Sequence, residues 1–184
     1  PMSIASLPSW LPSIAQALDF VHQQKYLHRD VKPANILFDS HGHAYLSDFG
    51  IIKALGEQAE ARSSKLTSDG FMVGTADYMA PELLTGQPVD GRSDQYALAA
   101  TIYEVLTGQV PFEGNTPAAV MVRHINEPAR PLTAFVPQLP PAANAAVLRG
   151  LSKLPQDRFG TCVELARAVL QAAREAKAAA TPPA

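Results

Sequence analysis

The chain of 184 residues is long enough for one domain with a sizeable core, and its 47% hydrophobic and 17% charged residues are typical of a globular protein. Its net charge of −2 gives no electrostatic footprint for nucleic acid or for an anionic membrane surface. The single cysteine, Cys162, excludes an internal disulfide, and no apolar run approaches the ~20 residues that span a bilayer. We therefore expect a cytoplasmic domain that contacts neither nucleic acid nor membrane.

The first half of the chain is predicted to contain one helix, one small β-hairpin and one long loop. Apolar residues at helical spacing indicate a helix from Leu11 to about Gln24. Two short apolar segments, 36–38 and 44–46, flank a turn-forming sequence, which is typical of a β-hairpin. Residues 56–72 are polar and have no sustained period, so we expect a long flexible loop, whose length alone suggests a function.

The middle of the chain is predicted to be helical. Residues 93–107 are apolar on nearly all sides, which is typical of a buried helix, and Gly108 follows as a stop signal. Thr116 and Pro117 suit the N-cap and the first turn of the next helix. The proline-rich residues 128–141 are expected to be irregular.

Two further helices and a tail are predicted to complete the chain. One helix covers about 142–153, and the last helix begins at the capping box formed by Thr161 and Glu164. The small residues of 177–184 suit a frayed tail or the start of a linker. We therefore expect one domain over residues 1–176, mainly α with a small β-hairpin.

Short motifs that carry chemistry occur in a fixed order. His-Arg-Asp occupies residues 28–30, and Asn35 follows five residues after the aspartate. Asp-Phe-Gly occupies residues 48–50, Ala-Pro-Glu occupies residues 80–82, and Asp94 comes twelve residues later. Each tripeptide alone is weak evidence, but the ordered set at these spacings leaves little room for chance.

The ordered set resembles the signature of protein kinases. The resemblance runs from about residue 11 to residue 173, and the sequences at 91–96 and 124–128 are most similar to bacterial receptor-type serine/threonine kinases. It implies a protein-kinase-like fold and an enzyme that transfers the γ-phosphate of ATP to serine and threonine hydroxyls of protein substrates.

The resemblance also implies which residues take part in the reaction. Asp30 is the base that accepts the proton of the substrate hydroxyl, and Lys32 places a positive charge beside the γ-phosphate. Asn35 and Asp48 provide hard oxygen ligands for Mg²⁺, with Mn²⁺ as the alternative metal. Leu37 lies beneath the adenine of ATP.

The resemblance also places Thr75 among the catalytic residues, where it is expected to hydrogen-bond toward Asp30 and Lys32 when its loop is in the active form. Structural and regulatory roles are implied for a second set of residues. Arg29 marks kinases that are switched by phosphorylation of this loop, and Thr67 is the expected acceptor because its phosphate can pair with Arg29. Other hydroxyls of the loop are Ser63, Ser64 and Ser68, which by composition alone are ordinary loop residues. Six residues are expected to be structural: His28, Phe49, Gly50, Glu82, Asp94 and Arg158. Among them, Asp94 is expected to cap the loop around Asp30, and Glu82 is expected to pair with Arg158.

The resemblance covers only the C-terminal lobe of a kinase. A whole kinase begins with a β-rich lobe that carries a glycine-rich loop and a strand lysine over the phosphates. No glycine precedes Asp30, and Lys25 is the single lysine there. We therefore expect a C-terminal lobe that has no turnover without its N-terminal partner lobe. We also expect it to self-associate through the face that this partner would cover. The cytosolic part of a membrane-anchored kinase is a second location that fits.

The sequence leaves room for another function, for a metal site at His41 and His43, and for a reactive cysteine at Cys162. A kinase-derived binding or scaffold module without turnover is the alternative function, and the intact set of Asp30, Lys32, Asn35 and Asp48 argues against it. His41 and His43 are expected to be solvated turn residues rather than a metal pair, because no third ligand is nearby in the sequence. Cys162 is expected to be inert, although a helix dipole at this position would lower the pKa of its thiol.

Overall fold

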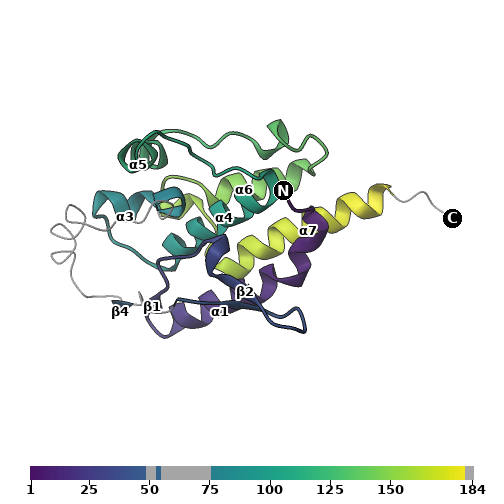
Figure 1. Cartoon of the computed structure of the whole chain (residues 1–184), viewed down its shortest axis with the longest axis horizontal. Coiled ribbons are helices and arrows are strands. Elements are labelled where there is room, and N and C mark those ends of the chain that lie inside the picture. The colour runs from purple at the N-terminus through teal and green to yellow at the C-terminus, as the bar shows by residue number, and fades with distance from the viewer. Residues whose placement is uncertain (49–52, 55–75, 181–184) are drawn as a thin grey trace.

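Helix α4 (Gly91–Thr107) lies at the centre of the fold in the computed structural model, which describes residues 1–48, 53–54 and 76–180. Helix α7 (Cys162–Ala180) packs against α1 (Leu11–Gln23) and α6 (Pro141–Gly150), and all three contact α4 (Figure 1). Almost every residue of α4 after its first turn is buried, as its apolar pattern predicts.

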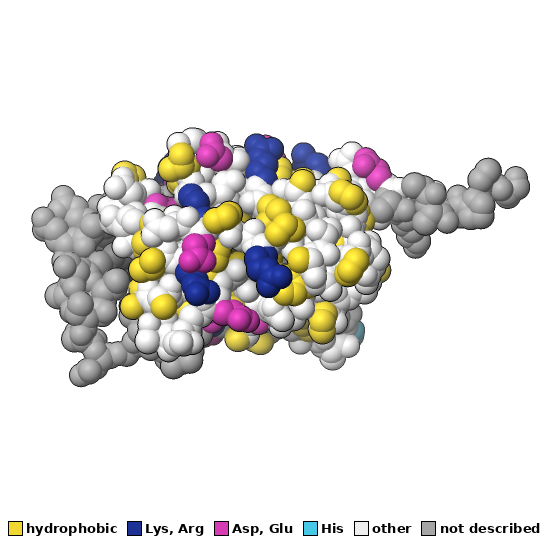
Figure 2. All heavy atoms as spheres, turned by 90° about the horizontal axis from the view of Figure 1, so that it is seen from above, with side chains coloured by type: hydrophobic (Ala, Val, Ile, Leu, Met, Phe, Trp, Pro, Cys, Tyr) yellow, Lys and Arg dark blue, Asp and Glu magenta, His cyan; other side chains and the backbone are white. Residues whose placement is uncertain are grey.

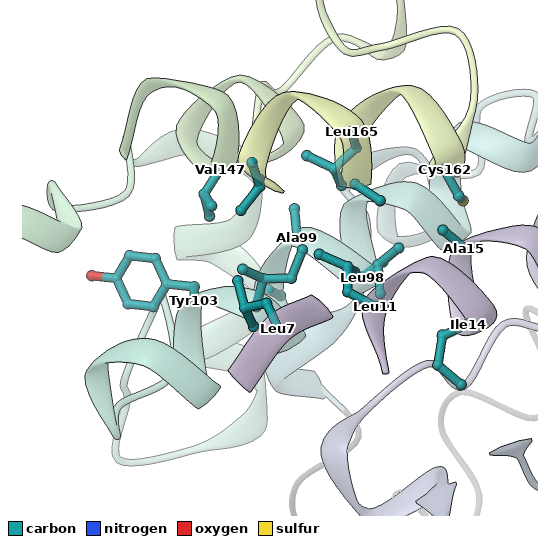
Figure 3. Close-up of a cluster of buried hydrophobic side chains, with 14 of the residues drawn as sticks. Leu7, Leu11, Ile14, Ala15, Leu98, Ala99, Tyr103, Val147, Cys162 and Leu165 are labelled. Carbon is teal, nitrogen blue, oxygen red and sulfur yellow. The ribbon is translucent and has the colours of Figure 1, made fainter. Parts of the chain in front are cut away.

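The hydrophobic core joins side chains from each of these helices (Figure 3). Leu11 of α1, Leu98 of α4 and Leu165 of α7 have no exposed surface. Close packing of α6 on α4 depends on a glycine, since a Cβ at Gly150 would lie 2.7 Å from the Cβ of Ala99. The core therefore holds α4 from several sides at once.

The described chain contains two small antiparallel sheets of two strands each. Strand β2 (Ile36–Phe38) pairs with β3 (Ala44–Leu46) in the register Ile36↔Leu46, which confirms the predicted hairpin. Strand β1 (Tyr26–Leu27) pairs with β4 (Lys53–Ala54). This second sheet was not predicted, because strands of two residues are too short for a period of two to be recognised.

Shorter elements complete the described chain. Helix α5 (Pro117–Asn126) begins at the predicted N-cap, where the Thr116 side chain accepts a hydrogen bond from the N–H of Ala119. The remaining elements are α3 (Pro81–Thr85) and the 3-10 helices η1 (Ile4–Ser9), η2 (Pro33–Asn35), η4 (Ala76–Tyr78), η5 (Leu132–Ala134) and η6 (Pro155–Asp157).

The C-terminal helix differs from its prediction in length and in its cap. Helix α7 continues to Ala180 and includes residues 177–180, which were predicted to belong to the tail. Its alanine-rich end has high intrinsic helix propensity, which explains the extension. At its start, the Thr161 hydroxyl accepts from the N–H of Glu164, whereas the Glu164 carboxylate accepts from the N–H of Gly160. The predicted capping box is therefore present in a modified form.

The surface carries charges of both signs. On the face seen in Figure 2, basic and acidic side chains alternate with hydrophobic ones. Leu37, Phe38 and Tyr45 of the β2–β3 hairpin are exposed. Self-association of the chain through the face that includes Leu37 stays a prediction. Within the described residues, no helix is long and apolar enough to cross a bilayer.

Candidate active site

Asp30, Lys32 and Asn35 converge on one loop, residues 28–35, which follows β1 and leads into β2. The Lys32 Nζ lies 3.0 Å from Oδ1 and 2.8 Å from Oδ2 of the Asp30 carboxylate. The Asn35 Nδ2 donates to Asp30 Oδ2 and to the Asp30 backbone carbonyl, both at 2.8 Å. The 3-10 helix η2 turns the chain back, so that Asn35 reaches Asp30. The result is a carboxylate that is fixed from two sides while 10% of its side chain remains exposed.

Asn35 and Asp48 offer oxygen atoms of the kind that a magnesium ion prefers. Asn35 is buried, and it donates both of its amide hydrogens to Asp30. Its amide oxygen is therefore the side-chain atom that can act as a metal ligand. The N–H and hydroxyl of Ser47 donate to the Asn35 carbonyl at 2.8 and 3.2 Å, which brings the exposed Asp48 next to it. An amide oxygen and a carboxylate are hard ligands, so these residues fit the metal that the motif implies.

The backbone of the loop is held by Asp94 from the first turn of α4. Its Oδ2 accepts from the N–H of His28 at 2.8 Å and its Oδ1 accepts from the N–H of Arg29 at 2.7 Å. Arg29 has a φ of 68° and Asp48 a φ of 63°, a left-handed conformation that is uncommon for residues other than glycine. Such conformations persist where the surroundings enforce them, and Asp94 does so at Arg29.

His28 ties the loop to the chain that precedes Asp48. Its side chain has no exposed surface, and its Nε2 lies 3.0 Å from the backbone carbonyl of Ser47. Ser47 thus contacts both Asn35 and His28, so the loop and the residue before Asp48 form one hydrogen-bonded unit.

Glu82 and Arg158 form a buried ion pair 76 positions apart in the sequence. The Arg158 guanidinium donates to both Glu82 oxygens, from Nη1 at 2.7 Å and from Nη2 at 2.8 Å, and its side chain is 0% exposed. Ser93 donates to the same carboxylate at 2.7 Å. The guanidinium also donates to the backbone carbonyls of Arg92, Ser152 and Lys153. Every oxygen and nitrogen of this pair is therefore satisfied within the described chain.

A small pocket opens beside Asp30. Its lining includes Asp30 from the loop, Tyr78 and Met79 from the segment before α3, and Ala97 from α4. The Tyr78 hydroxyl donates to Glu104, and burial together with this carboxylate raises the pKa of Tyr78. The segment that follows the long predicted loop thus lies against the same side of α4 as Asp30.

Several predicted site residues lie outside the described residues. These are Phe49, Gly50, Ser63, Ser64, Thr67, Ser68 and Thr75. Leu37 is described and is 52% exposed on the hairpin. Cys162 is fully buried, and burial raises the pKa of its thiol, so the alternative in which a helix dipole lowers this pKa is wrong. On the hairpin turn, His43 hydrogen-bonds to Asp39.

Three further residues, directly or through Asp94, belong to the hydrogen-bonded surroundings of the loop and were not predicted. His22 contacts Asp94, Asp19 accepts from the N–H groups of Cys162 and Val163 at the start of α7, and Ser47 contacts the loop from the β3 side. The spacing of Asp19 and His22, three residues apart on the predicted helix, was the available signal for a helical pair. Nothing in the sequence connected this pair to Asp94.

Comparison with known proteins shows the family to which the chain belongs. Residues 1–172 match the family described as protein kinase domain, and the chain belongs to this family. It is 38% identical over 170 residues to a probable serine/threonine-protein kinase, CE0033, of Corynebacterium efficiens, which covers 90% of the chain and 25% of that protein.

Two further relatives carry similar names. The chain is 40% identical over 150 residues to serine/threonine-protein kinase PknB of Mycolicibacterium smegmatis, covering 82% of the chain and 23% of that protein. It is 42% identical over 163 residues to serine/threonine-protein kinase PknF of Mycobacterium tuberculosis, covering 86% and 33%. The resemblance to bacterial serine/threonine kinases is therefore confirmed. The chain spans between about a quarter and a third of the length of these curated relatives.

Proposed function

We propose that the full-length protein is a serine/threonine protein kinase in which Asp30 accepts the proton of the substrate hydroxyl. The observation that carries the proposal is the Asp30 carboxylate, which is fixed by Lys32 and by Asn35 within 3.0 Å and is still open to the pocket beside it. A general base must be oriented and accessible at the same time, and this carboxylate is both.

The other residues of the loop support the same reaction. Asn35 holds Asp30 with its amide nitrogen and offers its amide oxygen to Mg²⁺, and Asp48 offers a carboxylate beside it. The Lys32 ammonium balances the charge of Asp30 and is the cation that would pair with the transferred phosphate. Mg²⁺ and ATP supply the transferable phosphoryl group and neutralise its charge; the chain supplies positioning and fixed charges.

Regulation by phosphorylation is part of this proposal. Arg29 is fixed through its backbone by Asp94, and a phosphate on Thr67 would be its partner; Ser63, Ser64 and Ser68 are the nearby alternatives. Thr67→Ala is expected to lower the activity of the full-length protein. Mass spectrometry of active protein should find phosphate within residues 63–68, and a fully active protein without phosphate there would contradict the proposal.

The base is tested by Asp30→Asn in the full-length protein. We expect transfer of labelled phosphate to a protein substrate to fall by ~10²- to 10⁴-fold, the usual contribution of a general base, while ATP still binds. Asp48→Asn should weaken binding of Mg²⁺-ATP as well, because a metal ligand loses its charge. The control is Asp39→Asn, which removes a carboxylate that bonds only to hairpin residues His41, His43 and Tyr45 among the described residues.

The same experiment separates a kinase from a scaffold module. A scaffold would show no transfer in the wild type, and its partner binding would not respond to Asp30→Asn. Normal turnover by the Asp30 variant would show that the assigned roles are wrong.

A further inference from the structure

The His22 side chain lies between two carboxylates from different helices. Its Nε2 is 2.8 Å from Oδ2 of Asp94 on α4, and its Nδ1 is 3.8 Å from Oδ1 of Asp19, one turn earlier on α1. Its side chain is 14% exposed, whereas that of Asp94 is 1% exposed. An imidazole with a carboxylate at each nitrogen is stabilised in the imidazolium form, which carries a hydrogen on both nitrogens.

Each of the two carboxylates also holds a backbone segment. Asp94 accepts from the N–H groups of His28 and Arg29 in the loop of residues 28–35, which is the catalytic loop of the proposed kinase. Asp19 accepts from the N–H groups of Cys162 and Val163 at 2.8 and 3.0 Å. These N–H groups lie in the first turn of α7, where the helix itself provides no acceptor for them. His22 therefore lies where it can couple the start of α7 to the catalytic loop.

The space for the His22 ring is provided by Gly91, the first residue of α4. A Cβ at this position would lie 2.5 Å from Nδ1 and 2.8 Å from Cγ of His22. These distances are far shorter than any normal contact, so a side chain at Gly91 and the present position of the ring exclude each other.

The charge state of His22 follows from the groups that face it. These are Asp19 from its own helix, Asp94 from α4 and the Cys162 thiol from α7. Burial disfavours a charged imidazole, but the hydrogen bonds and charges of Asp19 and Asp94 outweigh it and raise the pKa of His22 from 6.5 to about 9. Burial raises the pKa of the Cys162 thiol, which is therefore neutral and does not compete for the proton.

A metal ion is the alternative explanation of this cluster. Ligand atoms of Asp19, His22 and Cys162 lie within 4.8 Å of one another, and such a set of oxygen, nitrogen and sulfur occurs in zinc sites. However, both Asp19 oxygens already accept backbone hydrogens, and the thiol is protonated. The hydrogen-bonded imidazolium accounts for the three groups without a metal.

We propose that His22 is a positioning residue of the kinase. Its imidazolium fixes the Asp94 carboxylate, which fixes the backbone at His28 and Arg29 and thereby the direction of the Asp30 side chain. This inference rests on the proposed function, because Asp30 is the group whose position matters. Loss of the His22 charge does not alter the Asp30 carboxylate itself, but it releases the strained backbone that orients this carboxylate. We therefore expect kcat to change more than the KM for ATP.

The first test is His22→Gln in the full-length protein, with His41→Gln on the exposed hairpin turn as the matched control. We expect kcat to fall about 10- to 100-fold, since a displacement of about 1 Å can cost 10²-fold. The KM for ATP should stay within about twofold, because no ATP ligand is removed. In the wild type kcat should also fall as the pH rises past about 9, and the variant should lack this decline. An unchanged kcat in His22→Gln would overturn the proposal.

Gly91→Ala provides a second test that removes no titratable group from the chain. Alanine is the better helix former, so an effect of helix propensity would be favourable. The added Cβ instead displaces the His22 ring, and we expect the same loss of kcat. Normal kinetics in this variant would contradict the proposal even where His22→Gln does not fold.

Two measurements make the inference independent of enzyme activity. The NMR titration of His22 in the wild type should give a pKa near 9, and amide exchange at His28 and Arg29 should accelerate in both variants before that of α6. An NMR pKa near the usual 6.5, uniform acceleration in all helices, or a cobalt–thiolate absorption band on addition of Co²⁺ would each overturn the proposal. An inactive wild type with the expected NMR and exchange results would reject the proposed function instead.

Discussion

At the scale of single residues, the site uses side chains that serve two partners at once. Asn35 donates both amide hydrogens to Asp30, and Asp94 accepts from two backbone N–H groups of the loop as well as from His22. Removal of such a group breaks several interactions in a buried, low-dielectric place, so the cost exceeds that of one hydrogen bond.

Asn35→Asp separates the hydrogen bonds that this residue donates to Asp30 from its proposed role as a metal ligand. The carboxylate keeps an oxygen for the metal but replaces both hydrogen donors by acceptors that face Asp30. We expect kcat to fall at least about tenfold, since donors to a charged group contribute ~1.5–3 kcal/mol. The dependence of activity on Mg²⁺ concentration should change less than in Asp48→Asn, and steady-state kinetics at several Mg²⁺ concentrations measure both. A larger change in metal dependence than in kcat would contradict this division.

At the scale of elements, short segments are joined by side chains rather than by sheet or helix contacts. Helix α3 is five residues long, and its Glu82 is held by Arg158, which lies after η6. Gln95 of α4 holds the same region, because its amide accepts from the N–H of Phe159 and donates to the carbonyls of Phe159 and Thr161. Polar side chains of the α4 start thus fix segments that have little regular structure of their own.

Arg158→Met tests the buried ion pair. Removal of one partner leaves the Glu82 charge buried, and we expect the free energy of unfolding to fall by about 3–5 kcal/mol. The control is Arg123→Met, since Arg123 pairs with Glu127 at 3.7 Å with both side chains about half exposed, and should cost less than ~1 kcal/mol. Urea unfolding followed by circular dichroism measures both. A second change, Glu82→Gln, should recover part of the stability of Arg158→Met; no recovery would indicate that the guanidinium acts through the backbone carbonyls alone.

The long helices were predictable because their signals are local. The apolar pattern of 93–107 and the caps at Thr116 and Thr161 each lie within a few residues of the element that they define. The residues that converge on Asp30 also lie within one short loop, so a local motif predicts their proximity.

The contacts made over long separations in sequence were harder to predict. Three contacts depend on how segments far apart in the sequence pack together, and no local sequence pattern encodes that packing. They are the β1–β4 sheet, the hydrogen bonds from the start of α7 to Asp19, and the contact of His22 with Asp94. Glu82–Arg158 and Asp94 were expected through resemblance to a family rather than through the physics of the sequence.

At the scale of the whole molecule, two histidines predict how stability depends on pH. His22 has a raised pKa of about 9. Its contribution to the free energy of unfolding is therefore complete below pH 6.5 and is lost as the pH rises from 6.5 to about 9. His124 is fully buried, and burial, then the Lys153 charge, lowers its pKa to about 4. Its neutral form stabilises the fold above pH 6.5, and this contribution is lost as the pH falls toward 4.

Together these shifts place maximal stability near neutral pH. We expect the decline from pH 6.5 to 9 to be smaller in His22→Gln than in the wild type by roughly 3 kcal/mol, because one pKa unit corresponds to ~1.4 kcal/mol. Comparison with the variant is needed because Lys153, whose pKa burial lowers to about 8, acts with the opposite sign above that pH. Chemical denaturation at half-unit pH intervals measures the difference. Parallel curves for the two proteins would contradict the assignment of the basic decline to His22.

The dependence of the loop of residues 28–35 on Asp94 has a consequence during protein synthesis. His28 and the carboxylate that holds its N–H are 66 positions apart, and Glu82 precedes Arg158 by 76. At ~5–20 residues per second, the ribosome needs roughly 3 to 13 s to extend the chain by the 66 positions from His28 to Asp94. For that time the nascent chain carries His28, Arg29 and Asp30 without the group that enforces their backbone. The backbone beside Asp30 is thus fixed by Asp94 only after the start of α4 has left the ribosome.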